Sequence, residues 1–256
     1  MEQRFTFNAI ASLYDAVRPT YPDALFDDVV AAAGLAPGEA MLEVGCGAGQ
    51  ATQGFAKRGL NILALDPGPA MLEAARKRLA RFANVRFVET TFEAWPPAPA
   101  AFKLVAAAQS WHWIVPAIGF AKAAAALQPG GALAVFGNVA MPIAAPLGEA
   151  LAAVHARHAP HLAGPAPERS YLAGGPIEKL FEGASGFAAP THRSYPWTRR
   201  FDAPDYADLL RTKSDYQLLE PARRDELLAA VAQAVEAHGG QFELLYEAHL
   251  YVAKRS

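Results

Sequence analysis

The sequence predicts an α/β protein in which helices alternate with the strands of a mostly parallel sheet. Two observations lead to this prediction. Short, nearly uninterrupted apolar segments recur between residues 40 and 136, and segments with helical spacing of apolar residues separate them. Such alternation is typical of βαβ units, whose parallel strands are covered by helices on both faces. A chain of 256 residues without a repeat is expected to form one domain, residues 1–256.

Two helices are expected ahead of the first strand. Apolar residues between Ile10 and Val17 follow helical spacing until Pro19 stops the pattern. Pro22 then starts a second helix that ends at Gly34, because proline is favoured early in a helix and glycine just past its end. We interpret residues 1–39 as an N-terminal helical cap.

The alternation itself occupies residues 40–138, which we interpret as a cofactor-binding core. The expected strands are Ala40–Val44, Asn61–Leu65, Val85–Glu89, Lys103–Ala108 and Gly131–Phe136. The expected helices are Gln50–Arg58, Pro69–Arg81 and Ala117–Leu127, the last one stopped by Gln128-Pro129-Gly130.

The pattern changes after Gly137, and residues 139–256 are interpreted as a substrate-side insertion with closing strands. A helix over Leu147–His158 leads into Ala159–Pro176, a Pro- and Gly-rich stretch that predicts no regular element and is interpreted as a lid. The remaining expected elements are a strand over Tyr195–Phe201, two helices between Pro204 and His238, and a strand over Phe242–Val252. The last strand alternates apolar and polar residues, which predicts an antiparallel strand near a sheet edge.

Composition argues against several classes of protein. The residues are 52% hydrophobic and 19% charged. No run approaches the ~20 apolar residues of a membrane span, so no membrane contact is expected. The segment Met1–Phe5 lacks the apolar core of a signal peptide, so a cytoplasmic location is expected. A net charge of −2 gives no general attraction to nucleic acid, and the basic cluster at Arg76–Arg81 fits a solvated helix face.

No metal site is expected. The single cysteine, Cys46, excludes an internal disulfide and a cysteine-rich zinc site, and we expect it to pack as a small buried residue. The seven histidines are scattered, and His155, His158 and His161 lie next to the Pro- and Gly-rich stretch.

A glycine-rich segment directly follows the first strand. Gly45, Gly47 and Gly49 have no Cβ, so the backbone can turn sharply off the strand and approach a ligand closely. The N–H groups at the start of the next helix favour an anionic group, either a phosphate or an amino-acid carboxylate. The loop alone does not distinguish these ligands.

Two further residues favour S-adenosylmethionine over a dinucleotide. The dinucleotide pattern G-x-G-x-x-G requires a glycine where this chain has Gln50. Asp66 ends the second strand, seventeen residues after Gly49, where a carboxylate can accept hydrogen bonds from both ribose hydroxyls of an adenosine. The expected cofactor is therefore S-adenosylmethionine, with S-adenosylhomocysteine as its product.

The order and spacing of the strand ends resemble the motifs of class I, S-adenosylmethionine-dependent methyltransferases. The matching segments are Met41–Gln50, Leu63–Leu72, Val85–Pro96, Leu104–Trp113 and Leu127–Phe136. Residues Tyr14–Pro22 and the C-terminal half are similar to the bacterial trans-aconitate methyltransferase group. The resemblance implies a Rossmann-like, seven-stranded sheet with one antiparallel strand, helices on both faces, N-terminal helices and an inserted lid.

The resemblance also implies cofactor contacts by position. These contacts are Tyr14, Arg18, Glu43, Gly45, Cys46, Gly47, Gly49, Gln50, Asp66, Pro67, Met71, Thr91, Phe92, Gln109 and Ser110. Gly45–Gly49 would hold the methionine part, Asp66 the ribose, and Pro67 and Met71 the adenine. Thr91 replaces an aspartate that is common in the family, so only a backbone contact to the adenine edge is expected there. Gln109 and its neighbour end the fourth strand, near the expected sulfonium.

Methyl transfer is an in-line displacement at an activated carbon, so a site that aligns nucleophile and sulfonium needs no dedicated catalytic residue. Trp111, His112 and Trp113 follow the fourth strand and are candidates for contacts with the substrate. His112 could act as a general base, or the three side chains could line the pocket or pack in the core.

The first helix supplies further candidates. Tyr14 could approach the reacting atoms, Arg18 could bind a carboxylate through two hydrogen bonds, and Tyr21 could contact the substrate. The alternative is that the tyrosines pack in the core and Arg18 stays solvated. Solvated surface is expected for the weaker candidates His192, Arg193, Arg211 and Tyr216.

The acceptor is expected to be a small molecule. Methyltransferases that act on DNA bases or protein glutamine carry a motif similar to Asn/Asp-Pro-Pro-Tyr after the fourth strand. This chain has Gln109-Ser110-Trp111-His112 at that place. We expect methylation at a carboxylate or hydroxyl oxygen, with nitrogen and carbon left open, in a monomer or homodimer. The rival hypotheses are a non-catalytic, cofactor-binding partner or regulatory protein and a nicotinamide oxidoreductase.

Overall fold

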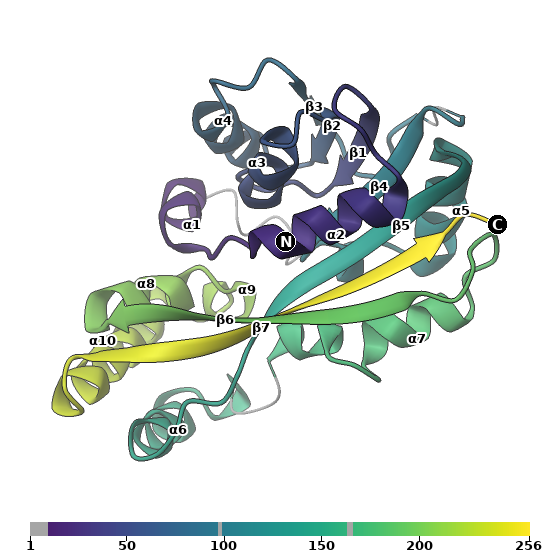
Figure 1. The fold of residues 1–256 in the computed structure, drawn as a ribbon. Coiled ribbons are helices and arrows are strands. Elements are labelled where there is room, and N and C mark those ends of the chain that lie inside the picture. Colours follow the sequence, from purple (N-terminus) through teal and green to yellow (C-terminus); the bar gives the residue numbers. More distant parts are fainter. Residues whose placement is uncertain (1–9, 97–98, 163–165) are drawn as a thin grey trace.

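The computed structural model describes residues 10–96, 99–162 and 166–256, and they form one seven-stranded sheet (Figure 1). The strands are β1 (Ala40–Val44), β2 (Asn61–Asp66), β3 (Val85–Glu89), β4 (Phe102–Ala108), β5 (Leu127–Ala140), β6 (Thr191–Asp202) and β7 (Gln241–Lys254). Their order is β3-β2-β1-β4-β5-β7-β6, and β7 runs antiparallel to both of its neighbours. The predicted mostly parallel α/β sheet with one antiparallel strand is confirmed.

Helices lie on both faces of this sheet. They are α1 (Ala11–Val17), α2 (Asp23–Ala33), α3 (Gln50–Ala56), α4 (Pro69–Arg78), α5 (Pro116–Ala126), α6 (Leu147–His158), α7 (Pro176–Glu182), α8 (Ala203–Arg211), α9 (Ser214–Gln217) and α10 (Pro221–Ala237). Short 3-10 helices among the described residues include η2 (Trp111–Trp113), η3 (Pro160–Leu162) and η4 (Pro167–Tyr171). Helices α2, α3 and α4 pack on one face, while α5 and α7 pack on the other. No helix among the described residues has the length and apolar character needed to cross a membrane.

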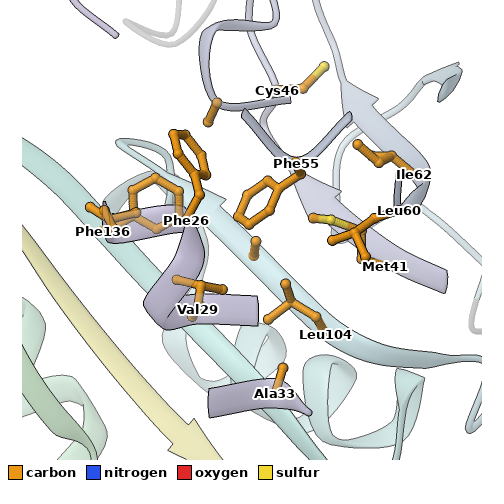
Figure 2. Close-up of a cluster of buried hydrophobic side chains, with 14 of the residues drawn as sticks. Phe26, Val29, Ala33, Met41, Cys46, Phe55, Leu60, Ile62, Leu104 and Phe136 are labelled. Atoms are coloured by element: carbon orange, nitrogen blue, oxygen red, sulfur yellow. The ribbon is translucent and has the colours of Figure 1, made fainter. Parts of the chain in front are cut away.

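The first core lies between the sheet and α2–α4 (Figure 2). Phe26 from α2 packs edge-on against Phe55 from α3, with ring centroids 4.9 Å apart. Phe136 from β5 lies 6.2 Å from each of these rings. Edge-to-face aromatic contacts add to the burial of apolar area, so this cluster fixes both helices beside the carboxyl ends of the strands.

Strands β5, β6 and β7 continue past the other four strands and carry α6, α8 and α10 (Figure 1). A third cluster of buried residues fills this region, including Phe201, Tyr206 and Leu244. The substrate-side residues therefore share the sheet with the cofactor-binding core, because the same long strands pass through both.

The structure changes two sequence predictions about these strands. The pattern was expected to break at Gly137, but β5 continues to Ala140, and the ring of Tyr171 rests on this glycine. A Cβ at Gly137 would lie 2.8 Å from that ring. β7 is antiparallel and lies next to the edge strand β6, as predicted for a strand near a sheet edge, but its second half is buried on both faces. Its alternation is confined to the first half of the strand.

The stretch predicted as a lid is partly packed against the sheet. Of Ala159–Pro176, residues 163–165 lie outside the described residues, as do Met1–Phe5 and the rest of the cap before Ile10. Tyr171 is fully buried, and its backbone carbonyl accepts a hydrogen bond of 3.0 Å from the Tyr251 hydroxyl. Helix α7, which begins at the end of this stretch, was not predicted. Three helices, α8 to α10, lie where two were expected.

Candidate active site

A cavity of about 140 Å³, the larger of two that meet at Gln109 and Asn138, lies at the carboxyl ends of β1, β2 and β4, under α1. The predicted site residues that line it are Tyr14, Arg18, Tyr21, Gly45, Cys46, Gly47, Gln50, Asp66, Pro67, Met71, Thr91, Phe92, Gln109, Ser110 and Trp113. Ligands of open α/β sheets bind at this edge, where the strand order reverses. The site residues come from distant parts of the chain because the sheet brings these strand ends together.

The glycine loop has the backbone conformation that its sequence predicts. Gly45, Gly47 and Gly49 have φ angles of 68°, 55° and 86°, in the left-handed region that side chains disfavour. A Cβ on Gly45 would lie 2.6 Å from the Cβ of Ser110. The loop therefore also needs glycine for the close approach of β1 to the end of β4.

Asp66 lies against this loop. Its Oδ2 accepts a hydrogen bond from the Gly47 N–H at 2.9 Å, and its Oδ1 accepts one from the Gly68 N–H at 2.8 Å. Burial raises the pKa of Asp66, and these two backbone donors oppose the shift. Each oxygen can accept a second hydrogen bond, so the carboxylate is oriented and still able to bind hydroxyl groups.

Two other acidic groups of the predicted site are buried more deeply. Glu43 is fully buried outside the lining of the cavity, and burial raises its pKa to about 8, with the Thr52 hydroxyl opposing and Asp66 adding to the shift. Burial also raises the pKa of the Cys46 thiol. Cys46 packs in the first core, as predicted (Figure 2), so it is a protonated apolar residue rather than a reactive thiolate.

The adenine side of the predicted site is apolar. Met71 is buried beneath α1, and Phe92 stacks on Trp95 with ring centroids 6.3 Å apart. The Thr91 hydroxyl accepts a hydrogen bond from the Ala94 N–H at 3.1 Å, so it stabilises the local turn. Pro67 lines the same part of the cavity.

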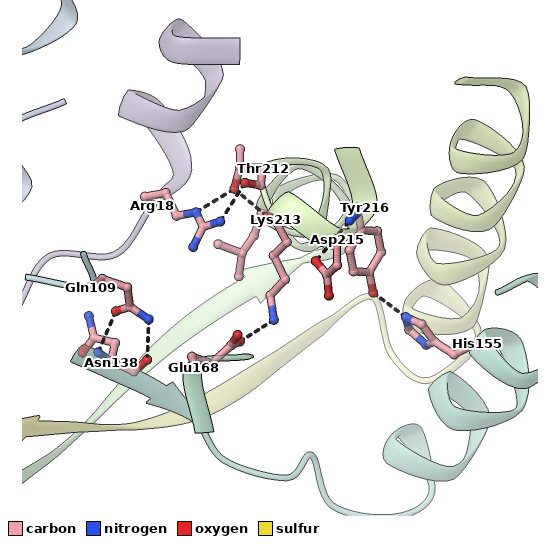
Figure 3. Close-up of polar contacts among 10 residues, drawn as sticks. Arg18, Gln109, Asn138, His155, Glu168, Thr212, Lys213, Asp215 and Tyr216 are labelled. Atoms are coloured by element: carbon pink, nitrogen blue, oxygen red, sulfur yellow. Dashed lines mark hydrogen bonds and ion pairs between the residues drawn. The ribbon is translucent and has the colours of Figure 1, made fainter. Parts of the chain in front are cut away.

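Gln109 directly follows β4, and Asn138 lies near the end of the neighbouring strand β5. The Asn138 N–H donates to Gln109 Oε1 at 2.9 Å, and Gln109 Nε2 donates to the Asn138 carbonyl at 3.2 Å (Figure 3). Gln109 has a φ of 55°, a strained conformation for a residue other than glycine. The Ser110 hydroxyl donates to the Val44 carbonyl at 2.5 Å. These bonds hold the β4 end in one conformation.

Helix α1 and the turn after it cover the cavity. Arg18 donates from Nε to the Thr212 hydroxyl at 2.9 Å and from Nη2 to the Thr212 carbonyl at 2.7 Å (Figure 3). Its guanidinium carbon lies 4.9 Å from the centre of the Tyr14 ring. The Tyr21 hydroxyl donates to Gln109 Oε1 at 3.4 Å. Two of the Arg18 donors that could hold a carboxylate are therefore bound within the protein.

The cluster after β4 is divided between cavity and core. Trp111 is 1% exposed and packs edge-on against Phe120, whereas Trp113 lines the larger cavity. His112 lies outside the lining of both cavities, and its Nδ1 is 3.2 Å from the Tyr171 hydroxyl. Burial lowers the pKa of His112 to about 4, with Glu168 opposing the shift. Three predicted site residues, His112, Glu43 and Gly49, thus lie outside the lining of the larger cavity.

Comparison with known proteins identifies the part of the chain that builds this cavity. Residues 41–131 match the family model described as a methyltransferase domain. Residues 41–131 are therefore similar to a methyltransferase domain. The structure of a protein from Anaeromyxobacter dehalogenans, named a putative type II methyltransferase, superposes on this chain with a TM-score of 0.63 and 24% identity, over 92% of this chain and 97% of the other. The predicted resemblance is confirmed for the domain and for its fold.

Curated relatives of this methyltransferase domain match part of the chain. An uncharacterized methyltransferase of Mycobacterium tuberculosis is 32% identical over 137 residues, 54% of each chain. A trans-aconitate 2-methyltransferase of Acidovorax is 38% identical over 98 residues, 37% of this chain and 36% of that one. The chain spans about half the length of the first of these relatives and a third of the second. The similarity to the trans-aconitate group is therefore partial.

A second, smaller cavity, which was not predicted from the sequence, adjoins the larger cavity. It shares Arg18, Pro19, Gln109 and Asn138 with the larger one. The rest of its lining is Ala140, Glu168, Tyr206, Leu209, Leu210, Lys213, Leu244 and Tyr246. Asn138 could have been found as the polar residue after an apolar strand, but the residues beyond it belong to no recognised motif.

Two residues expected at the solvated surface, Tyr216 and His192, contact other side chains of the protein instead. Tyr216 is buried, and its hydroxyl lies 2.5 Å from His155 Nε2, while His155 Nδ1 donates to the Leu151 carbonyl (Figure 3). His192 stacks on His249 between β6 and β7, with 3.0 Å between the facing nitrogens. Neither Tyr216 nor His192 lines the two cavities. The described residues contain no group of three or more ligands that could hold a metal ion.

Proposed function

We propose that the protein transfers a methyl group from S-adenosylmethionine to an oxygen atom of a small-molecule acceptor. One observation carries this proposal. In a methyltransferase domain, Asp66 lines the cavity with its carboxylate held by the Gly47 and Gly68 N–H groups. An oriented carboxylate beside a glycine turn is the arrangement that binds a ribose next to an anionic group.

The residues around the larger cavity fit this cofactor. Gln50 is buried beside the glycine loop, and its Nε2 has no hydrogen-bond partner among the described residues. A buried amide donor costs free energy unless it is bound, so a polar ligand group at Gln50 would satisfy it. The apolar lining at Met71 and Phe92 suits the flat adenine, and Asp66 suits its ribose.

When bound, the cofactor would supply a methyl group on a positively charged sulfur: the acceptor oxygen would bond to the methyl carbon as the carbon–sulfur bond breaks, S-adenosylhomocysteine would leave, and a hydroxyl acceptor would release its proton to solvent. The chain has to align the two molecules and exclude water, and these tasks require no acid or base from the protein. Gln109 and Asn138 lie between the two cavities and hold the β4 end in place. The catalytic roles predicted for His112 and Tyr14 stay predictions, and His112 would have to leave Tyr171 to reach the larger cavity.

The proposal is tested by incubating the protein with methyl-labelled S-adenosylmethionine and a panel of small carboxylic acids and alcohols. The expected result is label in one small product, with S-adenosylhomocysteine formed in equal amount. Binding of the cofactor without transfer to any class of acceptor would instead support a non-catalytic binding protein. Transfer only to protein or nucleic acid would contradict the proposed acceptor.

A matched pair of variants tests the role of Asp66. Asp66→Asn removes the charge but keeps the shape, and should weaken S-adenosylhomocysteine binding by at least about tenfold, since hydrogen bonds to a charged group are stronger. The control is Glu89→Gln, which should leave binding unchanged. Glu89 is exposed at the end of the neighbouring strand β3. Equal affinity of Asp66→Asn and the unaltered protein would contradict the ribose contact.

A further inference from the structure

The smaller cavity contains an unusual set of charges. It is lined by Arg18, Lys213 and Glu168, while its other walls are aromatic, aliphatic or neutral polar. Lys213 Nζ lies 2.5 Å from Glu168 Oε1, and the two side chains are 19% and 16% exposed (Figure 3). A sheltered ion pair loses much of its hydration, so its presence in a cavity wall requires a reason beyond stability.

The three charges do not cancel. Two cations face one anion, so the described lining carries one net positive charge. Burial would raise the pKa of Glu168, but Lys213 and the Glu168 backbone N–H hold it below its usual value, so the carboxylate stays ionised. One further carboxylate would make the set neutral. Charge-assisted hydrogen bonds from lysine and arginine are the usual way in which proteins hold such a group.

The size of the cavity limits what can enter. Its volume is about 50 Å³. One water molecule needs roughly 10–15 Å³ measured in this way, so the space suits a group of a few heavy atoms. Tyr206, Leu209 and Leu244 form apolar walls that would accept a short aliphatic stem.

The position of the cavity relates it to the reaction. The two cavities share Gln109 and Asn138, whose amide groups are fixed by mutual hydrogen bonds. A molecule anchored beside Lys213 would extend past these amides toward the larger cavity. Glu168 comes from η4, in the stretch predicted as a lid, so this stretch contributes to the wall of the smaller cavity.

We propose that the smaller cavity binds an anchoring carboxylate of the methyl acceptor, separate from the atom that is methylated, between Lys213 and Arg18. This inference rests on the proposed methyl transfer. It defines the acceptor as a molecule with an anionic end and a nucleophilic oxygen, held at two points. Glu168 orients the Lys213 ammonium and sets the net charge of the cavity at a single positive unit, which selects for one carboxylate.

The test uses butyrate as the probe, with butyramide and butylamine as uncharged and cationic controls of the same length. Ligand-detected NMR in the presence of saturating S-adenosylhomocysteine measures the binding of each. Butyrate should bind at least about tenfold more tightly than butyramide, as expected for one charge-assisted contact. Equal binding of butyrate and butyramide, or preferential binding of butylamine, would overturn the proposal.

Two variants should change butyrate binding in opposite directions. Lys213→Met removes a cation and should weaken binding about tenfold, whereas Glu168→Gln removes the anion and should strengthen it about threefold. Weakening by both variants would mean that the ion pair is only structural and would overturn the proposal. Lys179→Met, at an exposed position in α7, is the control for loss of a lysine.

Cofactor binding separates this inference from the proposed function. All variants should bind S-adenosylhomocysteine with the affinity of the unaltered protein, which also shows that they are folded. If the unaltered protein does not bind S-adenosylhomocysteine, the proposed function itself is contradicted. Intact cofactor binding without any preference for butyrate overturns only the anchoring carboxylate.

Discussion

Arg18 and Thr212 are 194 residues apart in the sequence and are joined by two hydrogen bonds of 2.9 and 2.7 Å. On the other side of α1, Arg78 Nε donates to the Asp15 carboxylate at 2.7 Å. Helix α1 is thus fastened to α4 on one side and to the end of α8 on the other. Because α1 covers the larger cavity, these contacts join the cofactor side of the fold to the acceptor side.

The contact between Arg18 and Thr212 should appear as a coupling energy. Arg18→Met and Thr212→Val should each lower the free energy of unfolding, and the double variant should lose less than the two single losses together. A coupling of about 1 kcal/mol is expected for a part-buried contact of this kind. Urea unfolding of the four proteins measures it. Strictly additive losses would show that the two side chains do not stabilise each other.

Substitution of Gly45 should be costly for two separable reasons. Gly45→Ala forces a side chain into the left-handed region, at about 1–2 kcal/mol, and places its Cβ against the Ser110 Cβ, at about 1–3 kcal/mol more. Ser110→Gly removes only the second cost. Thermal or urea unfolding should therefore show a smaller loss for Gly45→Ala in the Ser110→Gly background. The same loss in both backgrounds would contradict the close approach.

This loop illustrates what sequence alone can predict. Three glycines after an apolar strand, followed by an acid at the end of the next strand, indicate both a turn and a ligand, because few other residues fit that backbone. The same reasoning located β1 and β3 at their observed bounds. Local sequence restricts these positions strongly, so most residues that line the larger cavity could be named from the sequence, while their contacts with a cofactor stay predictions.

The acceptor side could not be predicted in the same way. Glu168, Lys213 and Tyr246 lie on η4, after α8 and on β7, and they meet only because β5, β6 and β7 extend beyond the rest of the sheet. That extension depends on long-range pairing. The pattern was expected to change after Gly137, but β5 continues through this residue, which makes room for the Tyr171 ring, and its neighbours in sequence do not reveal that contact.

Glu43 should make stability depend on pH. Its pKa is about 8 in the folded protein and near 4.5 when unfolded. The folded state therefore holds a proton that the unfolded state has lost, and this contribution to stability falls as pH rises from 4.5 to 8, by about 1.4 kcal/mol per pH unit. Urea unfolding between pH 5 and pH 8 should show the slope in the unaltered protein. Glu43→Gln should remove it, and an unchanged slope would exclude Glu43 as its source.

His112 should stay neutral in the folded protein above its pKa of about 4. Its NMR signals should be constant at neutral and mildly acidic pH, with His112→Gln used to assign them. Since the unfolded side chain titrates near 6.5, the contribution of His112 to stability is lost as pH falls from 6.5 toward 4. Titration of the folded-state signal near 6.5 would show that the ring is hydrated and would restore His112 as a candidate base.

Calorimetry measures whether the larger cavity binds S-adenosylhomocysteine or a nicotinamide dinucleotide. The protein is titrated with S-adenosylhomocysteine and, separately, with NADH under the same conditions. We predict saturable binding of one S-adenosylhomocysteine per chain and no binding of NADH, because Gln50 stands where a dinucleotide site requires glycine. Saturable binding of NADH without binding of S-adenosylhomocysteine would contradict S-adenosylmethionine as the cofactor.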